Sequence, residues 1–155
     1  MLEITSLVDP GSPHVPTIAE RMADTLLEVL GERGADMYTP AWLQDRVRWH
    51  IEHGRVLLAL EGDKLLGYTQ LRMEEEEVGL YATTWVHPLA RRRGTASALL
   101  DAGEDWLSAQ GAGVLATNTD QDNTPLIRLF EARGFQIVLR VPDKGMVRLE
   151  RPLSP

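Results

Sequence analysis

Residues 85–97 read WVHPLARRRGTAS, and this segment predicts a strand, a basic loop and a helix in succession. Residues 78–86 are rich in β-branched and aromatic side chains, which are typical of a strand. Pro88 cannot donate a hydrogen bond to a strand ladder, and it biases His87 away from helical geometry. The strand is therefore expected to end where the basic loop begins.

The chain after the basic loop has the pattern of a helix. Apolar residues recur at helical spacing from Ala96 to Leu107, and Gly111 is placed to cap the C-terminal end. The first turn of such a helix carries unpaired N–H groups and the positive end of the helix dipole. The loop is therefore expected to lead into a positively polarised helix N-terminus.

This predicted helix N-terminus has the features of a phosphate site. Gly94 and the small residues after it let an anion approach the backbone closely, and three consecutive arginines add positive charge. A solvated basic turn is the alternative that the local sequence leaves open. The residues of the predicted phosphate site are Arg91, Arg92, Arg93, Gly94, Thr95, Ala96 and Ser97.

Two segments together resemble the GNAT superfamily of acyl-CoA-dependent N-acetyltransferases. Residues 91–96 match the Arg/Gln-x-x-Gly-x-Gly/Ala signature, and residues 123–135 match the spacing Asn-x-x-Leu-x-x-Leu-Phe-x-x-x-Gly-Phe. The resemblance implies that backbone N–H groups of the loop hold the pyrophosphate of coenzyme A. It further implies that the strand ending at Trp85 and Val86 pairs with the pantetheine arm and the acetyl group.

The same resemblance implies further cofactor contacts at Asn123 and Phe130, and it exposes a departure from the family. Many GNAT relatives have a tyrosine at the position of Phe130, where it protonates the departing thiolate. Some relatives have a glutamate base at the position of Asn118. Phenylalanine has no proton to donate and asparagine is no base at neutral pH, so cofactor binding is supported better than any acid–base pair.

Other residues are candidates for the proton transfers. Strand alternation predicts that Glu75 and Glu77 share a face with Tyr81, so a glutamate there is a candidate to accept a proton or hold an ammonium group. The alternative for the acidic run at residues 74–77 is a solvated turn that discourages edge pairing. Tyr81 is a candidate acid, with packing in the core as its alternative.

The two early helices meet near Tyr38 and Trp42, where GNAT-like proteins line the acceptor pocket, and core packing is the equal alternative for both residues. His50 and His53 are expected on the surface, because no third ligand at metal spacing accompanies them. We therefore expect no metal site.

The composition is ordinary for one globular domain of residues 1–155, with 43% hydrophobic and 25% charged residues. The chain has 23 acidic and 16 basic residues and a net charge of −7, which argues against nucleic-acid binding and mildly favours a cationic amine partner. Without cysteine, a membrane-length apolar run or a signal-peptide pattern, a cytoplasmic monomer or homodimer is expected.

The order of predicted elements gives a mixed α/β sheet, with an antiparallel N-terminal meander followed by a parallel, right-handed crossover. This is also the order of the GNAT fold. The expected strands cover residues 2–8, 55–60, 65–73, 78–86, 113–117, 135–141 and 146–149, and the expected helices cover residues 17–30 and 40–53 and follow Gly94 and Thr124.

The function expected from the sequence is acetyl transfer from acetyl-CoA to a primary amine of a small molecule or protein. The alternative is a catalytically poor GNAT-like module that binds acyl-CoA as a sensor or with a partner protein. Phe130 and Asn118 favour the alternative, whereas the loop signature is neutral between the two.

Overall fold

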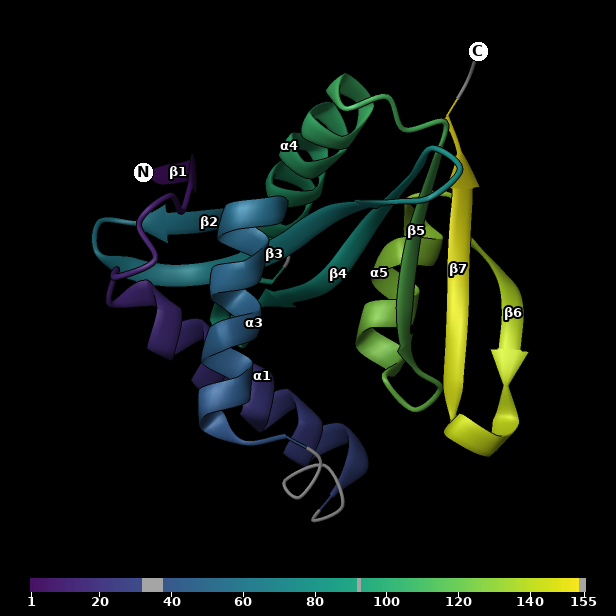
Figure 1. The fold of residues 1–155 in the computed structure, drawn as a ribbon, viewed down its shortest axis with the longest axis horizontal. Coiled ribbons are helices and arrows are strands. Elements are labelled where there is room, and N and C mark those ends of the chain that lie inside the picture. The colour runs from purple at the N-terminus through teal and green to yellow at the C-terminus, as the bar shows by residue number, and fades with distance from the viewer. Residues whose placement is uncertain (32–37, 92, 154–155) are drawn as a thin grey trace.

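The computed structural model describes residues 1–31, 38–91 and 93–153, which form one seven-stranded sheet with helices on both faces (Figure 1). The strands are β1 (Leu2–Ser6), β2 (Arg55–Glu61), β3 (Lys64–Glu74), β4 (Val78–Val86), β5 (Val114–Asp120), β6 (Gln136–Val141) and β7 (Met146–Pro152). The helices are α1 (His14–Leu30), α3 (Pro40–His53), α4 (Thr95–Ala109) and α5 (Thr124–Ala132).

The sheet has the strand order β1-β2-β3-β4-β5-β7-β6. Strands β1 to β4 pair antiparallel, β4 and β5 pair parallel through the crossover helix α4, and β7 lies between β5 and β6. The predicted mixed α/β fold, with its antiparallel meander and its parallel crossover, is confirmed.

The helix ends follow the capping residues in the sequence. The side chain of Thr39 accepts a hydrogen bond from the backbone N–H of Trp42 at 3.1 Å at the start of α3. Gly111 has a φ of 99°, and the N–H of Ala112 after it bonds back to the carbonyl of Leu107, which closes α4. Helix α1 begins three residues earlier than predicted, because Pro16 is tolerated in a first turn that needs no N–H donor.

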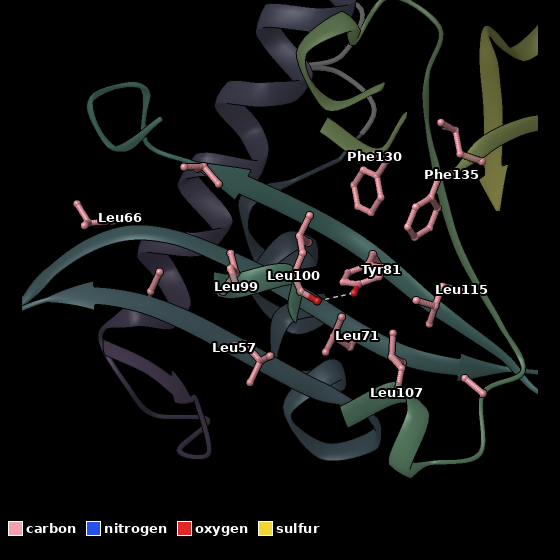
Figure 2. Close-up of a cluster of buried hydrophobic side chains, with 14 of the residues drawn as sticks. Leu57, Leu66, Leu71, Tyr81, Leu99, Leu100, Leu107, Leu115, Phe130 and Phe135 are labelled. Carbon is pink, nitrogen blue, oxygen red and sulfur yellow. Dashed lines mark hydrogen bonds between the residues drawn. The ribbon is translucent and has the colours of Figure 1, made fainter. Parts of the chain in front are cut away.

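Two hydrophobic clusters lie on opposite faces of the sheet. The cluster under α4 and α5 is built around Tyr81, whose ring meets those of Phe130 and Phe135 edge-on at centroid distances of 5.3 and 6.3 Å (Figure 2). The cluster under α1 and α3 contains Ile18 and Val47, both fully buried. The sheet is therefore covered on both faces where its strands are most apolar.

The central strands pair over only part of their length. The parallel register of β4 and β5 runs from Val78 opposite Val114 to Tyr81 opposite Thr117, although both strands continue beyond it. A β-bulge lies at the same level, since Gln70 of β3 faces Thr83 while its neighbour Leu71 faces Tyr81. Beyond this level β4 and β5 diverge (Figure 1), which opens the sheet at its centre.

Candidate active site

A pocket of about 420 Å³ lies where β4 and β5 separate, and we call it the central pocket. Its floor comes from β3, β4 and β5, and its walls come from α1, α3 and the start of α5. The polar residues that line its floor and the α5 side are Tyr68, Gln70, Arg72, Thr83, Thr84, Asn118, Thr119, Asp120 and Asn123.

The edge of β4 that faces the pocket presents free backbone groups. The N–H of His87 donates to the carbonyl of Leu66 in β3 at 2.7 Å. Because hydrogen bonds alternate along an antiparallel ladder, Trp85 also directs its backbone groups at β3, whereas Thr84 and Val86 direct theirs away from it. Val86, and not Trp85, therefore has its N–H directed toward the open edge.

The loop before α4, where the sequence predicts a phosphate site, leaves open space at the helix N-terminus. Gly94 is the N-terminal cap of α4 with a φ of 79°, a left-handed conformation that favours glycine, and a Cβ there would meet nothing within 4 Å. Gly94 is exposed, and so is Arg91, three residues before it. Arg93 forms an ion pair with Glu61 at 2.9 Å, which directs its guanidinium toward the end of β2. The predicted contact from Arg92 lies outside the described residues.

The rest of the loop forms the first turn of α4, where the N–H groups of Thr95, Ala96 and Ser97 precede the first helical hydrogen bond from Ala98 to Gly94. The side chain of Thr95 is buried and that of Ser97 is exposed. An open approach, free N–H groups and the positive end of the helix dipole are the features that favour an anion at this position.

The acidic run does not reach the central pocket. Glu76 and Glu77 have φ values of 60° and 61°, so they form a turn in which strand alternation no longer applies. Glu75 and Glu77 are exposed, and Glu74 bonds to Arg148 at 3.1 Å. The prediction that Glu75 and Glu77 face the acceptor beside Tyr81 is wrong, because the turn breaks the alternation before β4 begins and neither glutamate lines the pocket.

The interpretation of Tyr81 as an acid is also wrong. The bulge turns Tyr81 to the face opposite Thr83, and the phenol hydroxyl donates to the carbonyl of Leu100 at 2.7 Å inside the core (Figure 2). Burial raises the pKa of Tyr81. Phe130 is fully buried in the same cluster and does not line the pocket, which removes the predicted cofactor contact of its side chain.

The two asparagines do line the central pocket, at the end of β5 and the start of α5. Asn123, rather than the predicted Thr124, is the N-terminal cap of α5, yet its side chain donates to Thr119 at 3.2 Å instead of capping the helix. The side-chain oxygen of Asn118 accepts a hydrogen bond from Arg148 at 3.2 Å. Asn123 is therefore well placed for a ligand, whereas Asn118 is held by its neighbour.

The wall opposite these asparagines comes from α3. Tyr38 and Trp42 stack with ring centroids 4.5 Å apart, and both line the central pocket. His50, expected on the surface, is 1% exposed and also lines it. Its Nδ1 donates to the carbonyl of Arg46 at 3.0 Å and its Nε2 accepts from Arg72 at 3.1 Å, so the imidazole is neutral. Burial lowers the pKa of His50 to about 4.

Sequence reasoning missed Gln70, Arg72 and Asp120. Gln70 and Arg72 alternate along β3, and Asp120 lies two residues beyond Asn118 on the same strand, so each pair shares a face of the sheet. That alternation was the available signal. Which face meets the pocket depends on where β4 and β5 separate, a property that no single strand reveals.

The Acetyltransferase (GNAT) family matches residues 19–135, which include the α4 loop and the open edge of β4. The chain belongs to the GNAT acetyltransferase family. This GNAT chain is 30% identical to a mycothiol acetyltransferase of Actinosynnema mirum over 143 residues, which cover 81% of the chain and 48% of that protein. The chain thus spans about half the length of this curated relative.

Solved structures agree with this GNAT fold. Ard1 from Thermoplasma volcanium has a TM-score of 0.75 and 21% identity, and the alignment covers 99% of both chains. The acetyltransferase yncA from Salmonella typhimurium, solved with acetyl-CoA, has a TM-score of 0.77 and 18% identity over 99% of this chain and 94% of that one. The family that matches is one of acetyltransferases, and the cofactor in the solved yncA structure is acetyl-CoA.

Two kinds of feature are absent from residues 1–31, 38–91 and 93–153. These residues contain no cluster of three or more His, Cys, Asp or Glu side chains arranged to hold a metal ion. In the same part of the chain, no helix combines the length and apolar character needed to cross a membrane.

Proposed function

We propose that this GNAT acetyltransferase moves the acetyl group of acetyl-CoA to a primary amine bound in the central pocket. The observation that carries the proposal is the open edge of β4, which has one end at the α4 anion site and the other beside the pocket. A cofactor with a phosphate end and a thioester end fits such a continuous path.

Different groups of the chain bind different parts of the cofactor along this path. The first-turn N–H groups of α4, with Arg91 beside them, bind the pyrophosphate, and Asn123 contacts the pantetheine arm. The outward N–H groups of Thr84 and Val86 hold the arm and polarise the thioester carbonyl. Bound acetyl-CoA supplies an activated acyl thioester, and the protein supplies the position and the electrostatics.

Asp120 is the proton acceptor in this proposal. Among the described residues it is the acidic side chain that lines the central pocket, and it stands at the end of β5 beside the open edge. One of its oxygens accepts the N–H of Asp122 at 2.8 Å, which orients the carboxylate. It takes a proton from the acceptor's ammonium group directly or through water, so that the neutral amine can attack the thioester carbonyl and coenzyme A leaves as its thiolate.

A second candidate is a binding module with little catalysis. It is favoured by Phe130, which has no proton to give, and by Asn118, whose amide is engaged with Arg148. Such a module binds acetyl-CoA but releases no thiol with any amine.

One experiment tests both candidates. Thermal unfolding is followed with and without coenzyme A, because a ligand that binds the native state raises the Tm. Thiol release from acetyl-CoA is then measured with a panel of primary amines. A raised Tm with amine-dependent thiol release supports the transferase, a raised Tm alone supports the binding module, and an unchanged Tm at millimolar coenzyme A contradicts both.

A further inference from the structure

Two guanidinium groups of the central pocket approach one aromatic ring, that of Trp49, which lies outside the pocket lining. The guanidinium carbon of Arg46 lies 4.4 Å from the centroid of the Trp49 ring, and that of Arg72 lies 5.9 Å from it. Both arginines also line the pocket. Burial and then the positive charge of Arg46 lower the pKa of Arg72, so the two charges interact at the edge of the cavity.

Neither arginine forms an ion pair with a carboxylate within the described part of the chain. The ion pairs found there belong to other basic residues, and Glu74, two positions from Arg72 on β3, bonds to Arg148. Like charges this close raise each other's energy, and an anion placed between them removes the repulsion. Guanidinium groups are also the preferred partners of carboxylates.

His50 fixes one member of the pair without changing the charge. Its neutral imidazole accepts a hydrogen bond from Arg72, so that guanidinium has one N–H engaged and the others directed elsewhere. Because burial keeps the pKa of His50 at about 4, the histidine is uncharged at neutral pH. The wall is positive there.

Gln70 supplies a second, independent sign of a ligand. The residue is fully buried, its Nε2 donates to Thr83 at 2.5 Å, and its Oε1 has no hydrogen-bond partner within the described ranges. A buried acceptor without a partner is costly unless a ligand donates to it. Gln70 and Arg72 are two positions apart on one face of β3, roughly 7 Å along the strand.

We infer that the acceptor is an amino carboxylate, whose acid group binds between Arg46 and Arg72 and whose amine donates to Gln70. This inference rests on the proposed transferase function and names its substrate class. It replaces the cationic amine expected from the net charge, because the acidic run that supported that expectation lies away from the pocket. The carboxylate binds the positive wall, and the amine is then held near the thioester at the β4 edge.

The test compares matched amines in the thiol-release assay. Leucine, leucinamide and isoamylamine share a side chain and differ in the carboxylate. With the wild-type protein, kcat/KM is expected to be about tenfold or more higher for leucine, as one charge-assisted hydrogen bond provides. O-phosphoethanolamine and the polyamine putrescine complete the panel. A preference for either of these two overturns the carboxylate assignment.

Variants show whether the two arginines cause the preference. Arg46→Gln and Arg72→Gln are expected to remove most of the preference by raising the KM for leucine, and Arg72→Lys is expected to restore part of it. Arg21→Gln is the matched control, since Arg21 also lies over a tryptophan ring, that of Trp85, but does not line the pocket. A preference that survives both Gln variants overturns the inference.

A binding measurement separates this inference from the proposed function. The Tm is measured with leucine and with leucinamide in the presence of coenzyme A. A rise with leucine alone, lost in Arg72→Gln, supports the amino-carboxylate site even without turnover. Equal kcat/KM and equal Tm for the two amines contradict the site while leaving the transferase intact, and absent thiol release with a coenzyme A-dependent Tm contradicts the transferase.

Discussion

The hydroxyl of Thr117 donates a hydrogen bond to the carbonyl oxygen of Tyr81 at 2.9 Å, at the last position where β4 and β5 are paired. The donor is buried, and the acceptor belongs to the residue next to the bulge at Ala82. A side chain thus satisfies the backbone at the point where the two strands begin to separate. Pairing stops here without leaving a buried carbonyl unbonded.

Removing this hydroxyl is expected to weaken both the fold and the pocket. Thr117→Val keeps the volume but leaves the Tyr81 carbonyl without its donor, at a cost of about 1–3 kcal/mol in the free energy of unfolding. The affinity for coenzyme A should fall with it, because the opening of the sheet is less well fixed. Urea unfolding and coenzyme A titration measure the two effects, and Thr117→Ser, which keeps the hydroxyl, should restore both.

The α4 anion site is tested by charge reversal. Gly94→Glu is expected to abolish the rise in Tm with coenzyme A, because its carboxylate would occupy the approach to the helix N-terminus and repel pyrophosphate. The control is Gly111→Glu at the other end of α4, where the glycine also has a positive φ and open space. Both variants carry similar backbone strain, so normal coenzyme A binding by Gly94→Glu would contradict the site.

Asp120→Asn tests the proton acceptor. If the carboxylate takes the amine proton, its loss should lower kcat about a hundredfold or more at neutral pH while the Tm shift with coenzyme A stays. Asp122→Asn is the control, because Asp122 contributes only a backbone N–H to Asp120 and does not line the central pocket. An unchanged kcat in Asp120→Asn would exclude this role.

His50 makes the stability depend on pH. Its pKa is about 4 in the folded chain, chiefly through burial, against the ordinary 6.5 of histidine, so the unfolded chain binds more protons between these values. Stability is therefore complete above pH 6.5 and is lost as the pH falls toward 4, by about 3 kcal/mol in the free energy of unfolding.

Urea unfolding between pH 7 and pH 4 measures this effect. His50→Gln should flatten the pH dependence across the window, whereas His53→Gln, at an exposed position on the same helix, should not. An equal slope in wild type and His50→Gln would show that another group is responsible.

Phe130→Tyr tests whether the missing tyrosine limits the chemistry. Phe130 is fully buried and packs edge-on against Phe135 with ring centroids 4.9 Å apart, so an added hydroxyl would lie in an apolar cluster. We expect a loss of about 1–3 kcal/mol in the free energy of unfolding and no increase in kcat. Thiol release measures kcat and urea unfolding measures the free energy of unfolding. A higher kcat at neutral pH would contradict the expectation.

The fold was accessible from the sequence because its determinants are local. Helix boundaries lie at or beside Thr39, Gly94, Gly111 and Gly134. The apolar periodicity identifies the elements between them. The order of these elements, with the residues 91–96 signature, specified the sheet and the α4 loop.

The pocket was less accessible because its determinants involve two or more strands at once. The bulge at Ala82 reverses the face of Tyr81 relative to Thr83, and alternation read along β4 alone gives the opposite answer. His50 looked like a surface residue on a polar helix, and only the partner that β3 provides, Arg72, shows why it is buried. The positive charge of the pocket could not be predicted from one element either, because Arg46 lies on α3 and Arg72 on β3.

The bulge at Ala82 also limits how the gene can change. Before it, β4 directs Tyr81 into the cluster under α4, and after it, Thr83 faces the opposite side of the sheet, so the strand consists of two halves in opposite phase. Deleting or inserting one codon in this strand would shift the register of one half by one residue. Its buried and pocket-facing side chains would then exchange faces of the sheet. We therefore expect single-codon insertions and deletions in β4 to disrupt the pocket or the core.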